Sequence, residues 1–92
     1  MSDAKQEILS IKRDSNSIDG QLLNFLKTDP ISPGSSLADA VLVTLKIHWL
    51  PLVLYSMGVR GEKLRLPTLW ALQQLEAQAK LIRRICGIDN NT

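Results

Sequence analysis

Three polar side chains in the most apolar part of the chain have the residue types of a binding or catalytic site. Thr44, His48 and Tyr55 are four and seven residues apart, so they fall on one face of a helix. The histidine could bind a ligand or act as an acid or base. Alternatively, all three are polar groups of a core or an interface, each with a hydrogen-bond partner. We favour this alternative and keep the polar pocket as a hypothesis.

Metal and covalent chemistry find little support in the sequence. The chain has 1 histidine and 1 cysteine, whereas a zinc site takes about three or four side-chain ligands. Cys86 would need a base beside it to act as a nucleophile, and no spacing argument places His48 there. We therefore expect no catalytic residue, no metal and no cofactor, and we interpret Cys86 as a core packing residue. The protein is then not an enzyme.

The cysteine count and the first residues also bear on location. A single cysteine excludes a disulfide within the chain, which fits a reducing compartment. The opening Met-Ser-Asp-Ala-Lys-Gln-Glu is charged and lacks the apolar segment of a secretory signal. We expect a cytoplasmic protein.

Positive charge is concentrated in the last third of the chain. Residues 60–86 contain six basic and two acidic side chains, although the whole chain carries a formal charge of only +2. The basic residues are Arg60, Lys63, Arg65, Lys80, Arg83 and Arg84. The last three close a helix, where cations complement the helix dipole. If the first three fold back toward that end, all six could contact the phosphates of a nucleic acid.

An apolar seam runs along the last predicted helix. Its residues alternate in spacing between three and four, which is the pattern of a helix packed against another helix. They are Leu72, Leu75, Ala79, Ile82 and Cys86. The helix that packs against this seam is either the preceding long helix or belongs to a second copy of the chain, and the sequence leaves both possibilities open. From the preceding helix, the predicted interface residues are Leu50, Val53 and Leu54.

The stretch from residue 40 to 59 is long enough to span a membrane. Its ten leucine, isoleucine and valine residues contribute about −3 to −6 kcal/mol to insertion, and Lys46 offsets about +2.5 to +3.5 kcal/mol of this. His48 and Pro51 add further cost, so the sequence disfavours membrane insertion. A helix that is apolar nearly all round is instead expected to be central in a bundle or packed into a second chain.

Boundary signals divide the first half of the chain. Asp3 and Gln6 have the spacing of a capping box and predict a short helix over 4–13, unless residues 1–17 form a flexible arm. Residues 14–17 favour a turn. A second helix is predicted over 18–28. Two prolines and a glycine make residues 29–35 a linker.

The second half contains two long predicted helices. Ser36 caps the first, over 36–57, and Gly58 ends it. Pro51 should kink this helix rather than break it near Trp49, because no capping residue precedes the proline. Residues 59–66 are predicted to be a connector. Pro67 then starts a helix over 67–86, which Gly87 ends.

These signals predict an all-α bundle of three or four helices, with residues 18–88 as the domain and 89–92 as a tail. A domain of 92 residues is marginal alone and often gains stability by oligomerising. We therefore expect a non-enzymatic interaction module that self-associates, as a dimer or higher oligomer, or that docks on a larger protein assembly. The alternative is a small nucleic-acid-binding protein, or a subunit of a nucleoprotein complex, that uses the basic last third.

Overall fold

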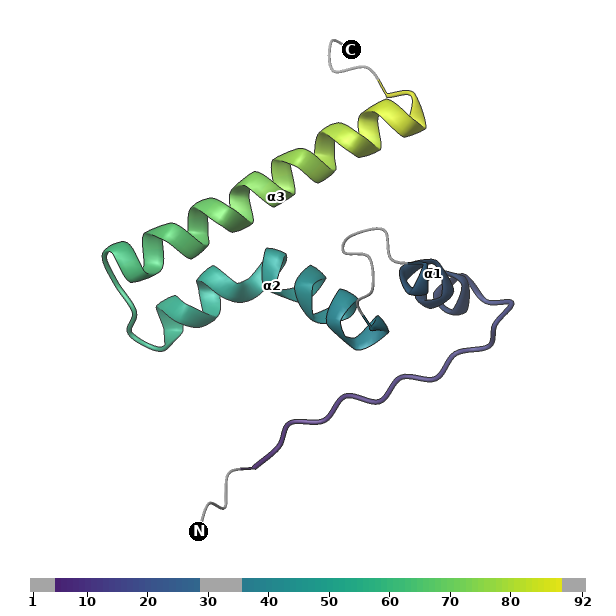
Figure 1. Cartoon of the computed structure of the whole chain (residues 1–92), viewed down its shortest axis with the longest axis horizontal. Coiled ribbons are helices and arrows are strands. Elements are labelled where there is room, and N and C mark those ends of the chain that lie inside the picture. Colours follow the sequence, from purple (N-terminus) through teal and green to yellow (C-terminus); the bar gives the residue numbers. More distant parts are fainter. Residues whose placement is uncertain (1–4, 29–35, 89–92) are drawn as a thin grey trace.

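Three α-helices make up the regular structure in the computed structural model, which describes residues 5–28 and 36–88. They are α1 (Ile18–Lys27), α2 (Leu37–Ser56) and α3 (Glu62–Cys86), and no strand occurs in these residues. A short turn joins α2 to α3, which pack against each other as an antiparallel hairpin, and α1 contacts α2 (Figure 1). The all-α class with three or four helices is confirmed. The predicted linker at 29–35 and the tail at 89–92 lie outside the described residues.

Only one short helix precedes the long pair, so the predicted helix over 4–13 is wrong for its described part. Residues 5–14 carry no regular secondary structure, and the segment leads away from α1 beyond Ile11 and Arg13, which lie beside that helix (Figure 1). Ile8 is 82% exposed and Ile11 is 48% exposed. An isolated helix shorter than about 12 residues is marginal in water without a packing partner. The segment contacts α1 only at Ile11 and Arg13, around a shallow hollow, so little packing supports a helix there.

The predicted turn at residues 14–17 is confirmed and sets the start of α1. The Asp14 carboxylate accepts a hydrogen bond of 2.9 Å from the backbone amide of Asn16. The Asp14 carbonyl accepts one of 3.0 Å from the backbone amide of Ser17. Ser17 then caps α1 by accepting the amide of Gly20 at 3.0 Å. A side chain at Gly20 would overlap the backbone of Asp14, so the close approach of turn and helix requires glycine.

Both ends of α2 follow the predicted caps. Ser36 accepts the amide of Asp39 at 3.1 Å. At the other end Gly58 has φ 91°, and the amide of Val59 donates to the Leu54 carbonyl at 3.0 Å, which forms a Schellman stop. The helix is continuous through Pro51, so it does not break near Trp49. Whether it bends there stays a prediction.

The start of α3 differs from the expectation. α3 begins at Glu62 rather than at Pro67, so most of the predicted connector over 59–66 is helical. The Gly61 carbonyl accepts the amides of Leu64 and Arg65 at 3.0 and 2.9 Å and opens the helix. Pro67 lies inside α3 and removes one backbone hydrogen bond. The extra turn half-buries Leu64, which offsets that loss. Gly87 ends α3 in the left-handed conformation, as predicted.

Small residues form the core. Among the described residues, only Ala40 and Ala71 are buried hydrophobic side chains, with 4% and 2% of their surface exposed. The larger apolar residues of α2 and α3 are at most half-buried. On α2 the half-buried ones include Val43, Ile47, Leu50 and Leu54, and on α3 they include Leu64, Pro67 and Leu75. The two alanines are small, so they bury little apolar area.

Ala71→Leu should lower the free energy of unfolding by about 1–3 kcal/mol, because a larger side chain forces the packed helices apart. Ala77→Leu is the matched control, since Ala77 is exposed on the same helix. Urea unfolding followed by circular dichroism, at one protein concentration for all variants, measures both. Equal effects of the two substitutions would show that Ala71 is not under packing constraint.

Candidate interaction surface

The outer side of α2 carries a continuous row of exposed apolar residues. Their spacing alternates between four and three, so they lie along one face of the helix. This outer seam consists of the apolar residues Ala38, Leu42, Leu45, Trp49 and Leu52, with the polar Ser56 at its end. Leu42 and Leu45 are 52% and 44% exposed, and Trp49 and Leu52 are 58% and 60% exposed. Within the described residues, nothing covers this face.

The two sides of α2 are therefore similarly apolar, and they differ in how much of their surface other parts of the chain cover. Ile47, Leu50 and Leu54 are half-buried on the side that receives α3, while Val53 is 49% exposed beside the outer seam. α2 is also the one helix of the described chain that is long and apolar enough to cross a membrane, and only 6% of its apolar stretch is buried. Lys46 interrupts it near its middle and is exposed.

The predicted seam of α3 is divided by the packing. Leu75 and Ala79 are half-buried, whereas Leu72 and Ile82 are 49% and 48% exposed. The expectation that Cys86 packs in the core is wrong, because its side chain is exposed. α3 has 25 residues and α2 has 20, and the end of α3 extends away from α2 (Figure 1). The apolar seam of α3 therefore extends beyond the end of α2.

The three polar residues of α2 lie on one face, as the spacing predicted, but they do not enclose a pocket. Thr44, His48 and Tyr55 are all exposed. The Thr44 hydroxyl donates to the Ala40 carbonyl at 3.0 Å. The Arg60 guanidinium lies 3.5 Å from the centre of the Tyr55 ring, and it donates to the Tyr55 carbonyl at 2.9 Å. Two of the three residues are thus engaged locally, on an open surface.

The six cations do not gather at one place. Because residues 62–66 belong to α3, Arg65 stays at its first turns while Lys80 lies near its end. A separation of 15 residues along a helix is about 22 Å. Arg60 contacts the end of α2, and Lys63 lies in the first turn of α3, whereas Arg83 and Arg84 lie in its last turn. The condition for a shared phosphate site, that the connector folds back toward the end of the last helix, is therefore not met.

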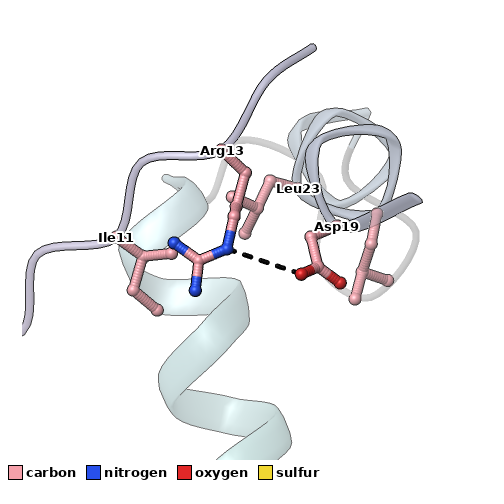
Figure 2. Close-up of a pocket in the computed structure, with 5 residues that line it drawn as sticks. Ile11, Arg13, Asp19 and Leu23 are labelled. Atoms are coloured by element: carbon pink, nitrogen blue, oxygen red, sulfur yellow. Dashed lines mark ion pairs between the residues drawn. The ribbon is translucent and has the colours of Figure 1, made fainter. Parts of the chain in front are cut away.

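A shallow hollow beside α1 is the remaining candidate. Figure 2 shows Ile11, Arg13, Asp19 and Leu23 around it, and Leu22 also lines it. The Arg13 Nε and Asp19 Oδ2 atoms are 3.4 Å apart, and both side chains are more than half exposed. An exposed pair of this kind contributes at most about 1 kcal/mol. In the described parts of the chain, no three histidine, cysteine or acidic side chains are grouped to hold a metal.

Sequence reasoning missed the outer seam, although its signal is present. Leu42, Leu45, Trp49 and Leu52 have the same alternating spacing that identified the α3 seam. Because α2 is apolar nearly all round, the spacing did not single out one face. Comparison with protein-family models, with curated proteins and with solved structures found no match to this chain.

Cys86 should react with a thiol reagent in the native protein at nearly its rate in the unfolded chain, because its side chain is exposed. Stopped-flow labelling over a range of protein concentrations tests this, with Cys86→Ser as the blank. Protection of about tenfold or more at high concentration would mean that a second chain covers the end of α3.

Proposed function

We propose that this protein is a non-enzymatic helical interaction module that self-associates through its exposed apolar helix faces, with the outer seam of α2 as the main contact. The observation that carries the proposal is that Leu42, Leu45, Trp49 and Leu52 form one uncovered apolar row. Isolated exposed apolar residues are ordinary on protein surfaces, but a contiguous apolar face is typical of an interaction site.

The total exposed surface supports this proposal. A compact monomer of 10.2 kDa is expected to expose about 5,300 Å², and this chain exposes 8036 Å². Its radius of gyration is 16.6 Å, against about 12 Å for a compact chain of this length. The extended segment at residues 5–14 contributes part of the excess. A standard interface needs only about 800 Å² from each partner, so the excess leaves room for one.

Association with a protein accounts for α2 better than membrane insertion does. Burying Lys46 at the centre of a membrane span costs about 2.5–3.5 kcal/mol on the insertion scale. In a helix-to-helix interface the same side chain stays at the edge of the seam and keeps its contact with water. The exposed position of Lys46 on α2 thus fits a partner that covers one face, with the charged edge left free.

Leu52→Glu should convert the self-associated protein to a monomer of 10.2 kDa. Removing the burial of one leucine costs about 1.5–3 kcal/mol, and a dimer loses it twice, so the Kd should rise at least about 100-fold. Leu66→Glu is the matched control, because Leu66 and Leu52 are 59% and 60% exposed. Light scattering after gel filtration without detergent gives the mass at low and high salt.

Three results would contradict the proposal. They are a wild-type monomer at all concentrations, an equal effect of the two substitutions, and recovery of the wild-type protein only in detergent. The absorbance ratio at 260 and 280 nm across the same peak tests the nucleic-acid alternative. Nucleic acid that elutes with the protein at low salt and is lost at high salt would favour phosphate contacts by the basic residues.

The bend at Pro51 is part of the same proposal, because it would set the direction of the last turn of the outer seam. Pro51 lacks the amide that would bond the Ile47 carbonyl, and its ring crowds that carbonyl. Pro51→Ala should therefore align residues 37–47 with residues 52–56. Residual dipolar couplings of the two segments measure their relative orientation. Collinear segments in the wild-type protein would show that no bend exists.

A further inference from the structure

The sizes of the residues along the outer seam follow nearly the same order from either end. This symmetry indicates what kind of partner covers the seam. Its ends are small, Ala38 and Ser56, and its middle is large. In a two-fold interface, residue i contacts residue j of the second copy and j contacts i. Read backwards, the seam pairs Ala38 with Ser56, Leu42 with Leu52, and Leu45 with Trp49. The face is self-complementary in size.

We infer that two copies of this chain pair antiparallel through the outer seam, with the two-fold axis at the level of Ile47 and with Leu45 of each copy against Trp49 of the other. This inference rests on the proposed self-association and specifies its geometry. Antiparallel helices oppose their dipoles favourably, whereas parallel ones align them. A parallel pair would also place Trp49 against Trp49 in one layer and Ala38 against Ala38 in another.

A competing antiparallel register is shifted by one heptad. It would place Asp39 of each copy near Lys46 of the other, and both side chains are exposed. Exposed ion pairs contribute about 0–1 kcal/mol each. The shift would leave Leu52 of both copies uncovered, and burial of each leucine is worth about 1.5–3 kcal/mol. Apolar burial therefore selects the full overlap over the two ion pairs.

The full overlap brings identical side chains together at the axis. Lys46 lies on one flank of the outer seam and His48 on the other, and each meets its own counterpart across the axis. On the His48 side α2 also carries Thr44 and Tyr55, with the Arg60 guanidinium over the tyrosine ring. α3 packs on the side of α2 that faces away from the outer seam. Asp19 of α1 is paired with Arg13. No described ion pair supplies an acidic side chain to either flank.

This arrangement places two like charges close together. The ammonium groups of the two Lys46 side chains repel each other, and like charges directly opposite each other weaken a contact between elements. The dimer therefore forms through its apolar seam against a repulsion at the Lys46 flank.

Sedimentation of the protein tests the flanking residues. Lys46→Gln should lower the Kd several-fold, because it removes the like-charge pair. In the shifted register Lys46→Gln would instead raise the Kd, because it removes two ion pairs. A Kd raised by Lys46→Gln overturns the inference.

A spin label at Met57 measures the register directly. Met57 is 70% exposed and lies beside the outer seam rather than in it, and Cys86→Ser removes the native thiol. Met57→Cys in that background should give a backbone separation of about 30 Å between copies by pulsed electron resonance. The shifted register gives about 40 Å and a parallel pair about 10 Å.

The spin-label distances distinguish the register of the dimer from self-association itself. A dimer with a separation near 40 or 10 Å overturns the register and leaves self-association intact. A monomer without dipolar coupling, confirmed as wild-type-like by its helical content, overturns both.

Discussion

The scarcity of buried apolar side chains is the constraint on which the rest of this structure depends. Ala40 of α2 and Ala71 of α3 are the buried hydrophobic residues of the described chain, at 4% and 2% exposure. Burial of side chains this small removes little apolar surface from water. The larger side chains of both helices are left half-buried or exposed. The thin core and the apolar surface therefore have the same cause.

The functional proposal follows from this shortage of burial and not from a chemical site. Thr44, His48 and Tyr55 share a face but remain open to solvent, and the cations are distributed between the two ends of α3. The polar groups that looked most capable of chemistry are the flanks of an apolar face. In the proposed two-fold assembly, Leu42, Leu45, Trp49 and Leu52 provide the contact and Lys46 lies at its edge.

Local signals predicted the helix ends well, and they failed where a tertiary contact decides the outcome. The caps at Ser36, Gly58 and Gly87 lie where the sequence placed them, because a cap depends on the few residues around it. The start of α3 was misplaced because Pro67 is a strong local signal for a first helical position. Packing of the preceding turn against α2 overrides that signal. The helix expected at residues 4–13 failed for the converse reason, since little packing supports it.

The sequence by itself determined the all-α class, the extents of α1 and α2, and the end of α3, because helical spacing and caps act over a few residues. It did not determine which side of α2 receives α3. A helix that is apolar nearly all round offers several equivalent faces, so their use depends on the geometry of the hairpin. Only the tertiary structure decided that Leu50 and Leu54 face inward, that Leu42, Leu45, Trp49 and Leu52 face outward, and that Cys86 lies beyond the reach of α2. These outcomes follow from the turn at Gly58–Gly61 and from the greater length of α3.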